Sequence, residues 1–213
     1  MADNVAALVR LMLVTDDRLV QGRDLIALAL AAERGGVTSV QLRLKRAEGR
    51  QLVQVVRGLM DALTVPVLVN DRPDVAMATG AAGIHLGPDD MPVELVRRIA
   101  PPGFIIGASV GSEAEAGKAG AADYWGIGPW RDTATKEAAG TGLGAEGFQR
   151  LVALANGKPC IAIGGVRPED VPIVMAAAGS GVAVVSGILG AEDVETAARA
   201  YAESLTVPPF SPS

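Results

Sequence analysis

Two side chains that often carry chemistry are almost missing from this sequence. Its 213 residues include one cysteine, Cys160, and one histidine, His85. A single cysteine excludes a disulfide framework and any metal site built from several thiolates. A single histidine excludes a metal centre held by two histidines of one chain. Chemistry in this protein must therefore depend on carboxylates, hydroxyls, lysines, arginines and backbone amides.

Positive charge is also in the minority, because 24 acidic residues face 19 basic ones and the net charge is -5. An acidic chain argues against nucleic acid as the main partner. Hydrophobic residues make up 49% of the chain, which supplies a core and excludes disorder. The N-terminus shows no basic segment ahead of a long apolar run, so we expect no secretory signal and a cytoplasmic protein.

One uncharged stretch, at 171–191, is long enough to cross a bilayer. Pro172 stands near its start, and Gly179-Ser180-Gly181 divides it into an alanine-rich half and a valine-rich half. This pattern predicts a helix, a turn and a buried strand. We therefore expect no membrane as a partner.

Apolar runs alternate with helix-compatible stretches along the whole chain. Most of the runs are continuous, as in parallel strands that are buried on both faces. The predicted strands lie at 8–14, 39–44, 67–69, 83–86, 104–108, 123–127, 160–163 and 183–185. The predicted helices lie at 23–34, 50–63, 73–79, 92–99, 113–119, 145–155, 168–178 and 193–204.

This alternation predicts an α/β fold in which eight parallel strands close into a (β/α)8 TIM barrel. No linker rich in proline, glycine or serine divides the chain, so we predict one domain over 1–206 and a loose tail at 207–213. A doubly wound open sheet is the alternative architecture. In a barrel, functional side chains gather where the strands end and the following loops begin.

Cations follow the second predicted strand. Alternation directs Gln41, Arg43 and Lys45 to one face of this strand and Leu42 and Leu44 to the other. The polar face must point into the barrel mouth, because helices cover the outside. Two cations and an amide in a concave site suit a polyanionic substrate. The alternative for Lys45 is the start of a solvated helix.

Carboxylates follow the third and fourth predicted strands. Asp71 comes directly after Asn70, and Asp89 and Asp90 follow the fourth strand. Neighbouring strand ends bring Asp71 near Asp90, and two carboxylates completed by phosphate oxygens and water suit Mg²⁺. The alternatives are a turn residue or an N-cap for Asp71, and an N-cap for Asp90.

Further groups follow the middle strands. Ser109 ends the fifth strand, and the long segment after the sixth carries Thr133, Thr135 and Lys136, whose hydroxyls and amine suit a phosphate. A flexible surface loop is the alternative for that segment. His85 lies within the fourth strand, where it either bonds a substrate or packs as a core histidine.

Glycine and small residues follow the last two strands. Gly164-Gly165 ends the seventh strand, and Val185-Ser186-Gly187 ends the eighth in an expected turn. Backbone N–H groups at these positions suit a phosphate, while tight turn geometry is the alternative explanation. The pattern thus predicts a cationic, metal-assisted anion site and a second, neutral one. Because no nucleophile stands out, it favours a reaction in which diphosphate leaves.

These segments, taken in order, resemble the thiamine phosphate synthase family, also called thiamine-phosphate pyrophosphorylase. The similarity starts at Leu13-Val14-Thr15-Asp16 and covers nearly the whole chain. The motifs that carry it are Gln41-Leu42-Arg43-Leu44-Lys45, Val69-Asn70-Asp71-Arg72, Gly83-Ile84-His85-Leu86-Gly87 with Asp90, Ile106-Gly107-Ala108-Ser109, Gly126-Ile127-Gly128-Pro129, Thr133-Ala134-Thr135-Lys136, Ala162-Ile163-Gly164-Gly165 and Val185-Ser186.

The resemblance implies a TIM-barrel transferase of thiamine biosynthesis. Such an enzyme joins 4-amino-5-hydroxymethyl-2-methylpyrimidine diphosphate to 4-methyl-5-(2-phosphoethyl)thiazole and releases diphosphate by a dissociative route. The implied metal ligands for Mg²⁺ are Asp71 and Asp90. The implied substrate-binding residues are Arg43, Lys45, Asn70, Ser109 and Lys136 for the diphosphate, Gln41 for the pyrimidine, and Thr133, Thr135, Gly165, Val185 and Ser186 for the thiazole phosphate. Lys45, Ser109 and Lys136 are the implied catalytic residues.

Some positions depart from the family pattern. Pro88 stands where glutamine is common, Arg131-Asp132 replaces an aromatic–proline pair, and Val110 follows Ser109 in place of a small residue or histidine. These changes bear on loop conformation and affinity. The alternatives are a thiazole tautomerase-like enzyme of the same superfamily, a regulatory barrel that binds a phosphorylated ligand without turnover, and an unrelated phosphate-handling barrel enzyme. The sequence leaves the oligomeric state open, a homo-oligomer included.

Overall fold

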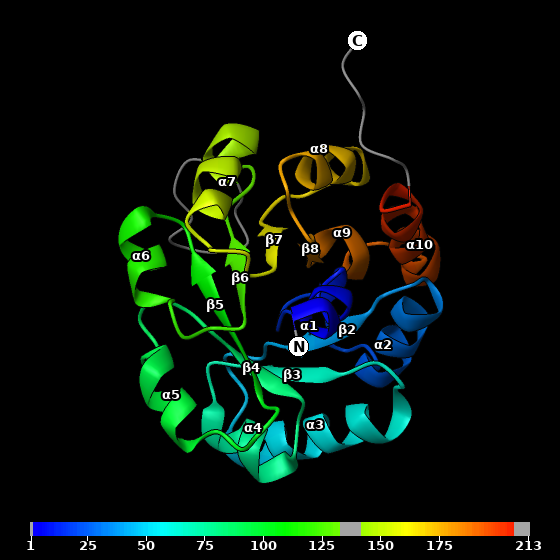
Figure 1. Ribbon diagram of the computed structural model, residues 1–213. Coiled ribbons are helices and arrows are strands. Elements are labelled where there is room, and N and C mark those ends of the chain that lie inside the picture. The colour runs from blue at the N-terminus through cyan, green and yellow to red at the C-terminus, as the bar shows by residue number, and fades with distance from the viewer. Residues whose placement is uncertain (1, 133–141, 207–213) are drawn as a thin grey trace.

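Eight parallel strands form a closed barrel in the computed structural model, which describes residues 2–132 and 142–206. Each strand pairs in parallel with the next, and β8 pairs with β1 to close the ring. Helices surround the strands as an outer ring (Figure 1). The predicted (β/α)8 barrel is therefore confirmed, and the predicted tail at 207–213 lies outside the described residues.

The strands are short and evenly spaced along the chain. They are β1 (Leu11–Val14), β2 (Ser39–Leu42), β3 (Val67–Asn70), β4 (Gly83–Leu86), β5 (Ile105–Val110), β6 (Tyr124–Ile127), β7 (Cys160–Ile163) and β8 (Gly181–Val184). The helices are α1 (Ala2–Leu8), α2 (Leu25–Arg34), α3 (Gly49–Ala62), α4 (Pro73–Thr79), α5 (Val93–Ile99), α6 (Glu113–Lys118), α7 (Gly144–Ala153), η1 (Pro168–Asp170), α8 (Val171–Ala176), α9 (Ser186–Leu189) and α10 (Val194–Ser204).

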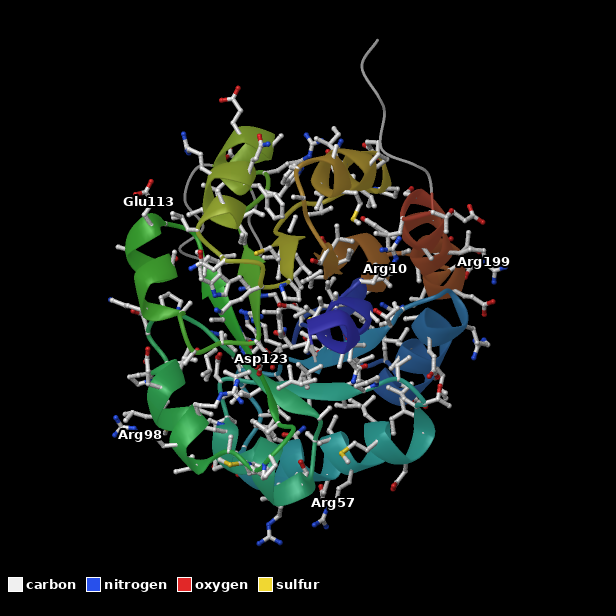
Figure 2. All side chains as sticks on the ribbon, in the orientation of Figure 1. Arg10, Arg57, Arg98, Glu113, Asp123 and Arg199 are labelled. Atoms are coloured by element: carbon white, nitrogen blue, oxygen red, sulfur yellow. The ribbon has the colours of Figure 1, made fainter. Side chains whose placement is uncertain are left out.

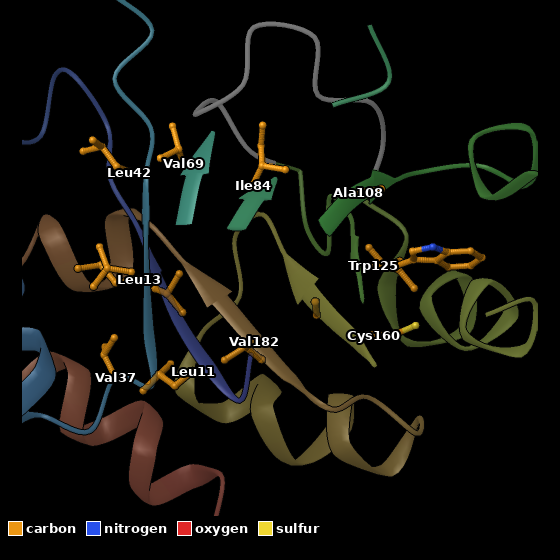
Figure 3. Close-up of a cluster of buried hydrophobic side chains, with 14 of the residues drawn as sticks. Leu11, Leu13, Val37, Leu42, Val69, Ile84, Ala108, Trp125, Cys160 and Val182 are labelled. Carbon is orange, nitrogen blue, oxygen red and sulfur yellow. The ribbon is translucent and has the colours of Figure 1, made fainter. Parts of the chain in front are cut away.

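Alternation along each strand separates two apolar clusters. The larger cluster lies between the strands and the helices, and its strand residues are buried on the outer face of the barrel. Figure 3 shows part of it, with strand side chains from Leu11, Leu13, Leu42, Val69, Ile84, Ala108, Trp125, Cys160 and Val182. Burial of these side chains attaches each helix to the barrel and leaves the inward face of each strand for other contacts.

The smaller cluster fills the barrel interior and continues into the N-terminal helix. Met12 and Tyr124 point inward from β1 and β6 and are buried against Val5, Leu8 and Val9 of the first segment. Helix α1 therefore lies across the end of the barrel at which the strands begin, at the centre of the ring in Figure 1.

This helix corrects the prediction of a strand over 8–14. The strand begins only at Leu11, because residues 2–8 are helical and Val9 donates its N–H to the Val5 carbonyl. Val5, Leu8 and Val9 follow the spacing of one helical face, which the continuous apolar run in the sequence obscured.

The uncharged stretch at 171–191 contains α8, β8 and α9. The predicted helix and strand are present in this stretch, and a second, short helix follows them. None of the helices within residues 2–132 and 142–206 is long and apolar enough to span a membrane.

Most charged side chains lie on the outside of the helical ring. Figure 2 shows Arg57, Arg98, Glu113 and Arg199 pointing away from the barrel. Among the residues whose burial is described, Asp170 is the only charged one in the buried class, with 2% of its surface exposed. It lies in η1, directly before α8.

Helix α1 should contribute directly to stability. We expect Leu8→Ala to lower the free energy of unfolding by about 3 kcal/mol, because it removes apolar contacts at the closed end of the barrel. Leu154→Ala is a matched control, since Leu154 is 45% exposed. Urea denaturation should separate the two variants, and equal losses would contradict the packing role of α1.

Candidate functional site

A cavity of about 420 Å³ opens where the strands end. Its walls come from the carboxyl ends of the strands and from the loops that follow, the position at which barrel enzymes carry their sites. The predicted residues that line it are Gln41, Arg43, Lys45, Asn70, Asp71, Asp90, Ser109, Gly165, Val185 and Ser186. Thr133, Thr135 and Lys136 lie outside the described residues. The fold thus brings every described member of the predicted set to one cavity.

The cationic wall is held by the loop after β1. The buried Thr15 hydroxyl accepts the Arg43 N–H at 2.8 Å and lies 3.2 Å from the Arg43 carbonyl oxygen, to which it donates. The Asp17 carboxylate accepts the N–H groups of Lys45 and Arg46 at 2.9 and 3.2 Å. These side chains replace a neighbouring strand as partners of the backbone. For this reason β2 ends at Leu42, two residues before the predicted end.

The Arg43 guanidinium also has a local partner. Its Nη1 lies 3.4 Å from Asp16 Oδ2, and both side chains are largely screened from water. The sequence pattern indicated Arg43 but gave no role to Thr15 or Asp17, whose side chains bond the backbone of Arg43 and Lys45. A buried threonine directly after a strand was the available signal for such a contact.

Two carboxylates face each other beside Lys45. Asp71 is within hydrogen-bonding reach of Asp90, and its Oδ2 lies 3.3 Å from Lys45 Nζ. Asp90 accepts the Gly87 N–H at 2.7 Å. Burial, with the hydrogen bond and charge of Asp90, raises the pKa of Asp71 to about 6, against the opposing effect of Lys45. The pair therefore carries unfavourable negative charge that a cation would relieve.

The capping alternatives for these aspartates do not apply. The N-cap of α4 is Arg72 and that of α5 is Pro92, and neither makes a side-chain capping bond. Asp71 instead has a φ of 61°, a left-handed conformation that non-glycine residues seldom adopt. Its N–H donates to the His85 carbonyl, which directs the side chain into the cavity wall. Strain of this kind is typical of functional sites.

A hydrogen-bonded chain crosses the barrel interior below the cavity. His85 Nδ1 lies 2.9 Å from the Tyr124 hydroxyl, and Nε2 lies 3.0 Å from Ser109 Oγ. Tyr124 also bonds Gln41, whose amide lies 3.4 Å from Met12 Sδ. His85 is buried in this chain, as the core alternative predicts, and its side chain also reaches the cavity wall. Gln41 and Ser109 are thereby fixed from beneath.

The opposite wall carries little charge. Gly164 and Gly165 adopt φ values of 91° and 74°, which only glycine accepts readily. Ser186 begins the short helix α9, which replaces the turn expected after β8. The turn prediction failed because Val185 starts a helical hydrogen-bond pattern, in which Leu189 donates to its carbonyl. The first turn of a helix leaves N–H groups available to an anion.

The loop after β5 adds residues that sequence analysis missed. Ser112 and Glu115 both line the cavity. Ser112 Oγ accepts the Glu115 N–H as the cap of α6, and Glu115 Oε2 accepts the Gly111 N–H at 2.5 Å. The Ser-x-x-Glu spacing was a readable signal for this capped helix.

The site can hold a divalent cation only with help from a ligand or water. The described part of the chain contains no group of three or more His, Cys, Asp or Glu arranged to bind a metal. Asp71 and Asp90 supply two carboxylates, and the surrounding cations and amides suit phosphate oxygens. Ions such as Mg²⁺ commonly combine one or two carboxylates with phosphate and water ligands.

Comparison with known proteins adds an independent result. Residues 11–188 match the family model described as thiamine monophosphate synthase. The chain is 44% identical to a thiamine-phosphate synthase of Methanoculleus marisnigri, over 92% of this chain and 94% of that protein. It is 46% identical to one of Azorhizobium caulinodans, over 89% of this chain and 91% of that protein.

Solved structures resemble the chain in the same way. A thiamine phosphate pyrophosphorylase from Pyrococcus furiosus aligns with a TM-score of 0.85 and 34% identity, over 95% of this chain and 98% of that one. A 3-hexulose-6-phosphate synthase aligns with a TM-score of 0.72 over 93% of this chain and 100% of that one, but at 18% identity it shares only the fold.

The aspartate pair predicts a pH-dependent stability. The pKa of Asp71 is higher in the folded protein than in the unfolded chain. The free energy of unfolding therefore falls as pH rises from about 4 to about 6, because the unfolded chain releases this proton first. Asp90→Asn removes the repulsion and leaves an oxygen for the Gly87 N–H. We expect the free energy of unfolding of this variant to exceed that of wild type by about 1 kcal/mol at pH 7.5 without divalent ions.

Denaturation curves in chelator at pH 4 and pH 7.5 would measure this difference. The difference in free energy of unfolding between Asp90→Asn and wild type should disappear at the lower pH. Asp89→Asn is the matched control, because Asp89 is exposed, and it should follow wild type. A difference that is the same at both pH values would contradict repulsion within the pair.

Proposed function

The chain belongs to the thiamine-phosphate synthase family of transferases in thiamine biosynthesis, and from this premise we propose its substrates and mechanism. The proposed substrates are 4-amino-5-hydroxymethyl-2-methylpyrimidine diphosphate and 4-methyl-5-(2-phosphoethyl)thiazole. The proposed products are thiamine phosphate and diphosphate. The reaction breaks the carbon–oxygen bond to the diphosphate and forms a carbon–nitrogen bond to the thiazole.

One observation carries this proposal. The cavity has two ends of different character, a wall with Arg43, Lys45, Asp71 and Asp90 and a wall built on Gly165 with its neighbours. A diphosphate with a metal ion suits the first wall, because cations and carboxylates share it. A monophosphate suits the second, where backbone N–H groups are the available donors.

The residues of the first wall have proposed roles in departure of the diphosphate. Asp71 and Asp90 would hold Mg²⁺, which neutralises negative charge on the leaving diphosphate when it is bound. Arg43 and Lys45 would bind the diphosphate oxygens, with Asn70 and Ser109 as hydrogen-bonding partners. The charge that the departing group develops is then matched by fixed positive charge in a partly enclosed site.

The remaining roles concern the two rings. Gln41 would place the pyrimidine, since its amide lies on the cavity floor and is held by the interior chain. Gly165, Val185 and Ser186 would bind the thiazole phosphate, so that the ring nitrogen faces the pyrimidine methylene carbon. A route in which diphosphate leaves first requires no protein nucleophile. The corresponding roles of Thr133, Thr135 and Lys136 rest on the resemblance alone.

Two alternatives make different demands on the site. A tautomerase-like enzyme would not require the diphosphate-binding set of Arg43, Lys45, Asp71 and Asp90. A regulatory barrel without turnover would not require two carboxylates beside a lysine. A cytoplasmic location stays a prediction from the sequence, which leaves the oligomeric state open.

Product formation tests the reaction directly. Purified protein with both substrates and Mg²⁺ should form thiamine phosphate and diphosphate in equal amounts, as measured by chromatography and a phosphate-release assay. Chelation should stop the reaction and added Mg²⁺ should restore it. Wild-type protein that binds the thiazole phosphate but forms no product would overturn the proposal.

Loss of the Lys45 ammonium tests the cationic wall. We expect Lys45→Ala to lower kcat by about 100- to 1,000-fold, because one fixed charge on the leaving group is removed. Lys158→Ala is the control, since Lys158 precedes β7 and lies at the other end of the barrel. Steady-state assays should show no change for the control, and an equal effect of both variants would exclude a specific role for Lys45.

A further inference from the structure

An ion pair connects the two segments that border the neutral end of the cavity. Arg131 lies four residues after the end of β6, and Asp170 is the last residue of η1, between β7 and α8. The Arg131 guanidinium bonds the carboxylate in two places, Nε to Oδ2 at 3.0 Å and Nη2 to Oδ1 at 2.5 Å. The contact is therefore a planar, two-point pairing of the kind that fixes orientation.

The buried Asp170 carboxylate accepts hydrogen bonds from several groups besides Arg131. Its carboxylate also accepts the Arg167 N–H at 2.9 Å and a side-chain bond from Trp130. Burial alone would raise the pKa of this carboxyl, but the bonds from Arg131, Arg167 and Trp130 lower it on balance. The group is thus ionised and depends on these partners, and Arg131 is the cation that pairs with it.

Arg131 also contacts the glycine turn through its backbone. Its N–H donates to the Gly164 carbonyl at 2.9 Å, and the Trp130 N–H donates to the Ile163 carbonyl at 2.8 Å. A Cβ placed on Gly165 would come within 3.0 Å of the Arg131 Cβ. The Arg131 side chain thus passes directly against Gly165 on its way to Asp170.

The burial of its carboxylate distinguishes this pair from the other ion pairs among the described residues. The Asp170 side chain is 3% exposed, whereas Glu195 beside Arg34 is 32% exposed and Glu169 beside Arg167 is 64% exposed. The Arg131 side chain reaches this carboxylate from the surface and is itself 45% exposed. Exposed pairs contribute little and constrain little. A buried carboxylate that loses its cation is left with an unfavourable charge. The buried Asp170 carboxylate, which follows the Gly164–Gly165 turn in the chain, therefore depends on Arg131 as its cation.

We propose that Arg131 is a positioning residue for the thiazole phosphate, acting through Asp170 and Gly165. Its side chain holds the Gly164–Gly165 turn in the position from which the backbone N–H groups donate to the phosphate. This inference rests on the proposed function. Arg131 itself takes no part in the bonds that break and form in the reaction.

Loss of the side chain should affect one substrate and spare the other. We expect Arg131→Ala to raise the KM for the thiazole phosphate about tenfold, since a small displacement of a binding group has effects of this size. The KM for the pyrimidine diphosphate and kcat should stay within about twofold of wild type. Arg131→Lys keeps the charge and one donor, and should recover part of the affinity.

Arg34→Ala is the matched control, because it removes an arginine–carboxylate pair from the outer surface. It should leave both KM values unchanged. An equal rise of both KM values in Arg131→Ala would indicate general loosening and overturn the inference, as would no rise at all. If Arg131→Ala is unfolded by circular dichroism, the test passes to Arg131→Lys, which must then raise the thiazole KM alone.

A binding measurement separates this inference from the proposed reaction. Inorganic phosphate titrated into wild type, Arg131→Ala and Arg34→Ala can be followed by ³¹P NMR without turnover. Weaker phosphate binding in Arg131→Ala alone supports the positioning role even if wild type forms no product. Equal binding by all three proteins, or none by wild type, overturns it.

Discussion

Closure of the parallel sheet is the constraint on which the rest of this structure depends. A closed ring has an inside, and every second residue of each strand must face it. Near the strand starts, Met12 and Tyr124 fill this space with apolar surface, and near the strand ends Gln41 and Ser109 line a cavity. The same alternation that builds the core therefore delivers Gln41 and Ser109 to one end, where the loops after the strands add the charged groups.

Electrostatic imbalance at that end is maintained by the backbone. Asp71 has an unfavourable φ. Its burial and the neighbouring Asp90 raise the pKa of its carboxyl, which opposes folding at neutral pH. The loop after β1 holds the compensating cations Arg43 and Lys45 by hydrogen bonds to their backbone. The charged groups of the site thus lower the stability of the fold, as functional sites commonly do.

The sequence predicted the parts of this arrangement that follow from period and order. Alternation within β2 placed Gln41 on the inner face, and strand order placed Asp71 near Asp90, because both rules act over a few residues or between neighbouring strands. Alternation does not account for Lys45, which lies beyond the end of β2 and is held by Asp17. Helix α1 and the buried Asp170 were missed. The first was hidden in a continuous apolar run, and the second depends on a side chain 39 residues away, a pairing that local pattern does not encode.

Helix α1 also has a consequence for the cavity at the opposite end of the barrel. Because Val5, Leu8 and Val9 close the end at which the strands begin, the cavity is reached from the other mouth. The same three residues pack against Met12 and Tyr124, which lie beneath the cavity. Helix α1 therefore supports the floor of the site from the far end of the barrel.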